Sequence, residues 1–214
     1  MQNIILIGPP GAGKGTLAKI LSEKYDIPHI STGSLLRAEV RKGTQLGKHI
    51  EKRLKDGVLM TNDELEPLLI KRLQQDDIKN GTLLDGFPRA LDQIELTDRV
   101  LSGIDLVIYI TVPREEILMR MSGRSNCSTC GAIYNKHKFP SKIEGVCDKC
   151  GGSLYVREED SEEVVLERLK IYKEVTEPVV DYYRQFDYFV ELDGRKGSET
   201  LLEIIENMLK RKAK

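Results

Sequence analysis

Short apolar segments alternate with amphipathic segments along most of this chain. The first apolar run, Asn3-Ile4-Ile5-Leu6-Ile7, is continuous, which is typical of a strand buried on both faces of a parallel sheet. Four later segments have the same character, at residues 28–31, 81–85, 105–112 and 188–192. Helical periodicity separates them, over 15–25, 64–74, 91–101, 114–121, from 162 onward and over 198–212. The alternation predicts an α/β fold, with a five-stranded parallel sheet and helices on both faces.

Two stretches do not fit this alternation, and we name them the first and the second insertion. The first, residues 31–60, contains two polar helical segments joined near Gly43 and closed by Gly57, and the second, residues 123–160, contains every cysteine of the chain. Each begins near the C-terminal end of a predicted strand or the helix after it, where α/β sheets bind ligands. We therefore expect two movable flaps over a site, the alternative being decorations remote from the chemistry. The predicted core consists of residues 1–30, 61–122 and 161–214.

Composition places the chain among ordinary soluble globular proteins, since 40% of its 214 residues are hydrophobic and 31% are charged. The formal net charge of −1 provides no global basic field, so neither nucleic acid nor a membrane is expected as the main partner. The longest apolar run, residues 106–112, is far too short to span a bilayer. The N-terminus also lacks the basic region and cleavage site of a signal peptide. We expect a cytoplasmic protein that acts as a monomer.

The first strand runs directly into a glycine-rich loop, Gly8-Pro9-Pro10-Gly11-Ala12-Gly13-Lys14-Gly15-Thr16. Glycines allow backbone N–H groups to wrap around phosphate oxygens, and Lys14 brings a positive charge to the β- and γ-phosphates at the N-terminus of the next helix. Gly15 stands where the common P-loop motif has Ser or Thr, so Thr16 is the nearest hydroxyl for Mg²⁺ or its water shell. A flexible turn is the simpler alternative, but the order of strand, loop, lysine and helix favours a site for a nucleoside triphosphate.

A second group of residues suited to phosphate follows the third predicted strand, in Asp85-Gly86-Phe87-Pro88-Arg89. Asp85 ends that strand beside the P-loop and can reach the magnesium shell, while Arg89 offers a two-pronged donor for a phosphate. Further arginines border the two insertions, at Arg37, Arg120, Arg124, Arg157 and Arg168. Each alone is an ordinary surface residue, but together they favour a phosphate-binding funnel, with Glu159 and Asp160 holding some of them in position. The three histidines, His29, His49 and His137, are scattered, and we interpret them as packing or surface residues.

The cysteines form two C-x₂-C pairs, Cys127 with Cys130 and Cys147 with Cys150, separated by 16 residues. This spacing predicts a structural zinc site in which four thiolates fill the tetrahedral shell. An insertion of fewer than about 40 residues cannot build an adequate core, so the metal would supply its folding energy. Two disulfides or an iron site are the alternatives. A zinc ribbon could also read nucleic acid, but the basic residues here are few and are not interleaved with several aromatic ones.

These motifs together resemble the adenylate kinase family in its long-lid, zinc-binding form. The resemblance rests on the P-loop, on Ser31-Thr32-Gly33, on Asp85-Gly86-Phe87-Pro88-Arg89 with Gln93, and on Gly123-Arg124 before the cysteines, and it covers essentially the whole chain. It implies a P-loop core, an AMP-binding domain at 31–60 and an ATP-covering lid at 123–160. The implied reaction is reversible, converting MgATP and AMP to two ADP, and serves adenine nucleotide homeostasis.

The resemblance also implies roles for individual residues. AMP would bind against Thr32, Arg37, Met60, Gly86, Arg89, Gln93, Arg157 and Arg168. ATP would bind to Gly11, Ala12, Gly13, Lys14, Gly15, Thr16 and Arg124, with Arg120 stacked on its base and Lys196 nearby. Lys14, Asp85, Arg89, Arg124, Arg157 and Arg168 would act in catalysis. Three residues depart from the usual family pattern: Ser34 in place of Asp, Ser125 in place of Arg, and Cys150 in place of the Asp of some relatives.

Two further functions remain open at this point. A kinase for UMP or CMP would share most of these motifs, although Gln93 favours adenine because its carboxamide can pair with the N6 amino group and a neighbouring ring nitrogen. A zinc-ribbon P-loop ATPase that binds nucleic acid is the alternative from another class. The lack of a convincing catalytic histidine agrees with a phosphate acceptor, which is already largely dianionic near pH 7.

Overall fold

The computed structural model describes residues 2–212 and contains a five-stranded parallel sheet of order β2-β3-β1-β4-β8. Its strands are β1 (Gln2–Ile7), β2 (His29–Ser31), β3 (Gly81–Asp85), β4 (Leu106–Thr111) and β8 (Phe189–Asp193). The strand at the centre, β1, is the one that leads into the P-loop, and its neighbour β3 ends at Asp85. The predicted α/β fold is therefore confirmed, with strand ends shifted by at most one residue.

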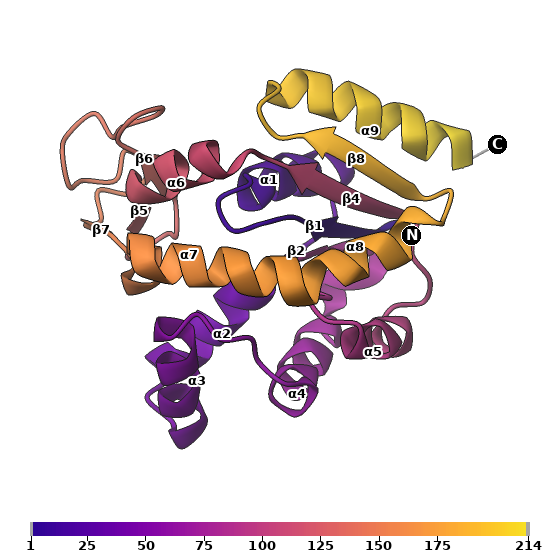
Figure 1. Cartoon of the computed structure of the whole chain (residues 1–214), viewed down its shortest axis with the longest axis horizontal. Coiled ribbons are helices and arrows are strands. Elements are labelled where there is room, and N and C mark those ends of the chain that lie inside the picture. The colour runs from indigo at the N-terminus through magenta and orange to yellow at the C-terminus, as the bar shows by residue number, and fades with distance from the viewer. Residues whose placement is uncertain (1, 213–214) are drawn as a thin grey trace.

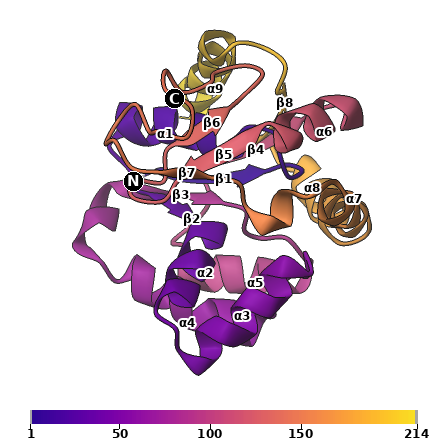
Figure 2. The same ribbon diagram turned by 90° about the vertical axis from the view of Figure 1, so that its left-hand side faces the viewer.

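Helices cover both faces of this sheet because successive side chains of a strand point to opposite sides. Ile4 and Leu6 of β1 belong to an apolar cluster with α1 (Lys14–Tyr25) and α9 (Ser198–Lys212). Ile5 and Ile7 belong to a second cluster on the other side. Its helices are α4 (Asn62–Leu73), α5 (Asp92–Val100) and α8 (Glu177–Arg184). Figure 2 shows α1 and α9 on the upper side of the sheet, with α4 and α5 on the lower side.

The first insertion forms the two predicted helices, α2 (Thr32–Arg41) and α3 (Gln45–Lys55). Gly43 makes the turn between them with a φ of +68°, a conformation that side-chain-bearing residues rarely adopt. Thr44 then caps α3 by accepting a hydrogen bond from the backbone N–H of Gly47 at 3.0 Å. The two helices lie below the sheet, next to α4 (Figures 1 and 2).

The second insertion follows α6 (Arg114–Ser122) and is built on a small antiparallel sheet of order β6-β5-β7. Its strands are β5 (Arg124–Cys127), β6 (Ile133–Asn135) and β7 (Leu154–Tyr155). In Figure 1 this insertion lies at one end of the molecule, beyond α6 and α7 (Glu162–Ile171). A 3₁₀ turn at Glu158–Asp160 connects it to α7.

The helical segment predicted from residue 162 onward runs as one continuous helical column through α7 and α8 in Figure 1. Between α7 and α8 lies a π-helical turn, Tyr172–Thr176, in which the N–H of Glu177 bonds to the carbonyl of Tyr172, five residues back. Pro178 follows directly, and a proline ring clashes with the carbonyl four residues earlier in a regular α-helix. The wider π turn accommodates that ring.

Helix ends differ from the sequence prediction mainly where caps decide them. The helix predicted from residue 64 begins at Asn62, because Thr61 and Glu64 form a capping box, with Glu64 accepting from the N–H of Thr61 at 2.7 Å. A 3₁₀ turn at Asp76–Asn80 then leads into β3. Within residues 2–212, no helix has both the length and the apolar character needed to cross a bilayer.

Candidate active site and cysteine cluster

The P-loop joins the end of β1 to the start of α1. Gly11 and Gly13 have φ values of +77° and +99°, and a Cβ on Gly11 would lie 2.9 Å from the Cγ of Met121. Lys14 folds back over the loop, and its Nζ donates to the carbonyls of Gly8 at 2.7 Å and of Pro9 at 2.9 Å. Desolvation lowers the pKa of Lys14 to about 7. The loop is therefore a cradle that holds a poorly solvated cation at the N-terminus of a helix, which suits an anion.

Asp85 stands next to this loop, at the end of β3. Its Oδ2 lies 3.9 Å from the position that a Cβ on Gly15 would occupy. The Nε2 of His29 lies 3.0 Å from the same oxygen, so the interpretation of His29 as a packing or surface residue was wrong. Burial alone would raise the pKa of Asp85, but the hydrogen bond with His29 and the charge of Lys14 lower it below its ordinary value. Asp85 is thus a carboxylate beside the phosphate loop.

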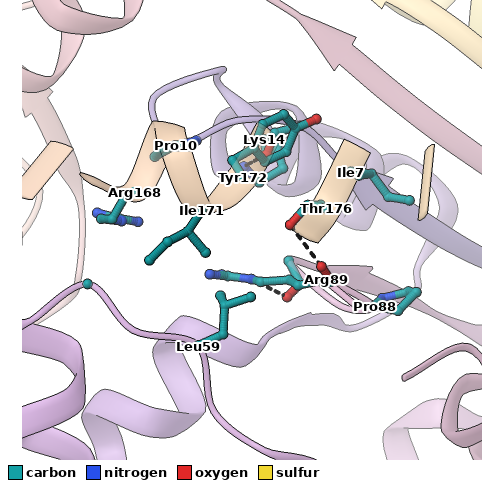
Figure 3. Close-up of a pocket in the computed structure, with 13 residues that line it drawn as sticks. Ile7, Pro10, Lys14, Leu59, Pro88, Arg89, Arg168, Ile171, Tyr172 and Thr176 are labelled. Atoms are coloured by element: carbon teal, nitrogen blue, oxygen red, sulfur yellow. Dashed lines mark hydrogen bonds between the residues drawn. The ribbon is translucent and has the colours of Figure 1, made fainter. Parts of the chain in front are cut away.

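A pocket opens between the P-loop and the helical column of α7 and α8 (Figure 3). Its cationic lining comes from Lys14, Arg89 and Arg168. The backbone of Arg89 is fixed on both sides, because its N–H donates to Oε1 of Gln93 and its carbonyl accepts from Thr176, each at 2.8 Å. Its Nε donates to the carbonyl of Gly86 at 2.7 Å. This pocket concentrates positive charge beside the P-loop.

A second pocket adjoins the first, and the two share Arg89 and Arg168. Its lining includes most of the residues assigned to AMP, namely Thr32, Arg37, Met60, Gly86 and Gln93. Thr32 donates to the carbonyl of Gly86 at 2.9 Å, while Nε2 of the buried Gln93 donates to the carbonyl of Met60 at 3.4 Å. The structure therefore brings these distant segments into one cavity beside the P-loop pocket.

Two carboxylates in the turn before α7 contact four arginines of the predicted funnel, namely Arg37, Arg124, Arg157 and Arg168. Nε of Arg124 donates to Oδ2 of Asp160 at 2.7 Å, and Arg168 lies 3.9 Å from the same carboxylate. Glu159 pairs with Arg37 at 3.4 Å. Desolvation and repulsion by neighbouring arginines lower the pKa values of Arg168 and of Arg157 to about 10. The prediction that Glu159 and Asp160 hold these arginines is confirmed, and the crowded cations favour an anionic ligand.

The two residues assigned to the ATP base, Arg120 and Lys196, line neither of these pockets. Arg120 donates to the carbonyl of Ala12 at 3.1 Å and to that of Gly194 at 2.9 Å. It therefore connects α6, the P-loop and the turn after β8. Lys196 is exposed in that same turn, and Thr16 is exposed on the first turn of α1. These positions place a second set of groups around the P-loop, away from the two pockets.

The four cysteine sulfur atoms all lie within 4.8 Å of one another. Thiolates that each bind one tetrahedral zinc at about 2.3 Å are about 3.8 Å apart. Two of the sulfur–sulfur distances are close to that value, Cys127 to Cys150 at 3.4 Å and Cys130 to Cys147 at 3.6 Å. Tight turns at Gly131 and Gly151, with φ values of +70° and +72°, directly follow the two C-x₂-C pairs. The donor set and its spacing fit a structural zinc ion.

Tyr134 is a residue of this cluster that the sequence reasoning did not find. Its hydroxyl lies 3.4 Å from Sγ of Cys147 and accepts a hydrogen bond from the N–H of Asp148 at 2.8 Å. Residues that hydrogen-bond to a metal ligand fix the orientation of that ligand. The sequence carried no signal for this role, because Tyr134 is 13 residues from Cys147 and comes close to it only in the folded insertion.

A P-loop at the end of the central strand, beside two adjoining pockets that share two arginines, is typical of a P-loop kinase. Residues 6–188 match the family model described as adenylate kinase. An adenylate kinase of Archaeoglobus fulgidus is 46% identical over 214 residues, which cover 98% of this chain and 99% of that protein. An adenylate kinase of Clostridium tetani is 48% identical over 213 residues, covering 97% and 98%. The chain belongs to the adenylate kinase family, and the prediction of that enzyme is confirmed.

Proposed function

We propose that this protein transfers the γ-phosphoryl group of MgATP reversibly to AMP, giving two ADP, with the residues of the two adjoining pockets in defined roles. The observation that carries the proposal is that both pockets are lined by Arg89 and Arg168, while Lys14 lines the one beside the P-loop. Shared arginines let two anionic tails approach each other without strong repulsion. Bringing them together is the main task of such a catalyst.

The transfer itself needs charge stabilisation more than proton transfer. An oxygen of the AMP phosphate attacks the γ-phosphorus, and the bond from that phosphorus to its bridging oxygen breaks, so that each nucleotide leaves as ADP. The attacking phosphate has a second pKa of about 6 and is mostly dianionic near pH 7, so a general base is unnecessary. In this proposal Lys14 neutralises the transferred group from the loop, and the arginines do so from the opposite side.

The donors around the P-loop also fit the magnesium ion of MgATP. Carboxylate and hydroxyl oxygens are ligands that Mg²⁺ accepts directly or through water, and Asp85 is an ionised carboxylate beside Gly15. Asp85 and Thr16 would hold the ion, which neutralises charge on the phosphate oxygens. The cysteine cluster would hold Zn²⁺ with a structural role, since four thiolates leave no open coordination position.

The two insertions have separate tasks in this proposal. Residues 31–60 form the AMP-binding domain and residues 123–160 form the lid over ATP, on a core of the remaining chain. Lys55 of α3 pairs with Glu158 at 3.2 Å, so the first insertion and the C-terminal end of the lid segment are already in contact. Closure of both segments would keep water from accepting the phosphoryl group. We further propose that the enzyme acts as a cytoplasmic monomer.

A coupled assay for ADP formed from MgATP plus AMP tests the activity, with CMP, UMP and GMP as competing acceptors. AMP should be strongly preferred, because the carboxamide of Gln93 lies buried in the second pocket. ATP hydrolysis without an acceptor, or a preference for CMP or UMP, would contradict the proposal.

The placement of the two nucleotides is tested by Arg89→Ala. We expect it to lower kcat/KM for AMP on the order of 100-fold and to affect MgATP binding far less. The matched control is Arg99→Ala, because Arg99 is exposed and pairs with Glu66 on the surface at 3.2 Å. Equal losses for both nucleotides with Arg89→Ala would show that the two sites are placed wrongly.

A further inference from the structure

We propose that Thr176 is a positioning residue for Arg89, and that its hydroxyl fixes the backbone from which the Arg89 guanidinium reaches the phosphates. The inference rests on the role proposed above for Arg89. It concerns a residue of the helical column that follows the lid, 87 positions away from Arg89 in sequence. Figure 3 draws the bond between these two residues, which both line the first pocket, as a dashed line.

The contact is short and protected from solvent. Oγ1 of Thr176 donates to the backbone carbonyl of Arg89 at 2.8 Å, and Thr176 is only 4% exposed. On the other side of the same residue, the N–H of Arg89 donates to Gln93 at 2.8 Å. The Arg89 backbone is therefore clamped between a threonine of the helical column and the N-terminal turn of α5. Its side chain starts from a fixed point, and the bond from Nε to Gly86 fixes its direction.

The π-helical turn explains why the hydroxyl points this way. A helical threonine commonly donates its single hydroxyl proton to the carbonyl three or four residues before it. Thr97 in the regular helix α5 does so, bonding to the carbonyl of Gln93 at 2.8 Å. Thr176 closes the wide turn that Pro178 requires, and its proton goes to another segment instead. The irregular turn thus creates a donor that a regular helix would have used internally, and π turns of this kind are frequent at functional sites.

The contact between Thr176 and Arg89 links the segments that carry Arg89 and Arg168, the two arginines that both pockets share. Arg168 lies eight positions before Thr176 on the same helical column. The Thr176 bond therefore ties the backbone of Arg89 to the element that presents Arg168. Displacements of about 1 Å in such groups can cost on the order of 100-fold in rate, so an anchor of this kind bears directly on the phosphates. Thr176 itself lines the first pocket beside Arg89.

The test compares Thr176→Val, which keeps the shape and removes the donor, with Thr176→Ser, which keeps the donor. We expect Thr176→Val to raise KM for AMP by about threefold to tenfold, as for loss of one neutral hydrogen bond, with KM for MgATP within about twofold of wild type. Thr176→Ser should restore most of the loss. The control is Thr82→Val, because buried Thr82 bonds to Asn3 at 3.4 Å at the far end of β3 from Asp85. It removes a buried hydroxyl without touching Arg89 and should leave both KM values unchanged.

A double-mutant cycle separates positioning from a general loss of stability. In the Arg89→Ala background, Thr176→Val should no longer change KM for AMP, because the group that it positions is gone. An unchanged KM for AMP in Thr176→Val, equal changes for both nucleotides, failed rescue by Ser, or full additivity with Arg89→Ala would each overturn the inference. An assay of the wild-type protein under the same conditions distinguishes failure of this inference from failure of the proposed function. Failure of the wild type to form ADP would refute the proposed function, whereas an active wild type with an indifferent Thr176→Val refutes the inference alone.

Discussion

The imidazole of His29, the first residue of β2, lies 3.0 Å from the carboxylate of Asp85, the last residue of the adjacent strand β3. In the register of these strands, His29 pairs with Leu83, two residues before Asp85, so the two side chains fall on the same face. The contact helps to lower the pKa of Asp85 against the effect of burial. It keeps the Asp85 carboxylate charged beside the P-loop at neutral pH.

Asp85→Asn should therefore reduce kcat strongly while the protein stays folded. We expect a loss on the order of 100-fold at saturating nucleotides and magnesium, because an amide cannot supply the negative charge that the magnesium shell requires. Steady-state assays across a magnesium titration measure it. The control is Asp77→Asn, an exposed surface partner of Arg72 at 2.7 Å, which should behave like wild type. Near-normal turnover of Asp85→Asn would remove Asp85 from the site.

Because the pKa of Lys14 is lowered to about 7, we expect the protein to take up a proton when ATP binds above neutral pH. Desolvation lowers this pKa in the nucleotide-free protein, so at pH 8 the amine is mostly neutral. Phosphate oxygens favour the charged form and raise this pKa, so binding at pH 8 draws a proton from the buffer. At pH 6 the amine is already charged, and uptake by this group should vanish.

Calorimetry of ATP binding in two buffers of different ionisation enthalpy measures this uptake. Lys14→Met should abolish the difference between buffers at pH 8, while Lys19→Met, at an exposed position of α1, should keep it. Equal uptake at pH 6 and pH 8, or uptake that persists without Lys14, would contradict the prediction.

From the cysteine cluster we expect that the second insertion folds only when a metal ion is bound. With the proposed zinc at this cluster, Cys147→Ser should prevent metal binding and unfold the insertion, because the metal would supply most of its folding energy, while the core keeps its own transition. Tyr134→Phe keeps all four sulfur ligands, so it should retain zinc with affinity reduced by roughly 10- to 100-fold.

Metal analysis and hydrogen exchange measure both effects. Exchange should rise across 124–155 in Cys147→Ser and stay slow in β1, which lies in the core sheet. Unchanged metal content in Cys147→Ser would exclude the zinc site, and loss of protection in β1 would show that the insertion is not an independent unit.

We expect that removing the carboxylate of Asp160 lowers the free energy of unfolding by a large amount. The side chain of Asp160 is fully buried, bonds to Arg124 through two contacts and lies near Arg168. Asp160→Ala leaves these guanidinium groups without their counter-charge and should lower the free energy of unfolding by about 3 kcal/mol. Urea denaturation measures this change. Glu158→Gln is the control, because that side chain is 71% exposed in its pair with Lys55 and should have little effect. Equal effects of the two substitutions would contradict the prediction.

Much of the fold and of the candidate sites could be predicted from residues that are neighbours in sequence. Continuous apolar runs indicated doubly buried strands, and the order Gly-rich loop, lysine and helix indicated a phosphate cradle. The spacing of the cysteines indicated their cluster, which the structure closes to within 4.8 Å. Helix ends were less accurate, since caps such as the one formed by Thr61 and Glu64 shift them by a turn or less.

Local pattern by itself determined the class of fold, the P-loop and the four-sulfur site, because period, turn chemistry and ligand spacing act over a few residues. Only the tertiary structure decided that His29 contacts Asp85 from 56 positions away, or that Thr176 holds Arg89 from 87. The first contact depends on the register of two parallel strands, and the second on a widened helical turn facing a distant loop. Neither leaves a periodic trace in the chain, since each arises only when packed elements bring separate segments within hydrogen-bond reach.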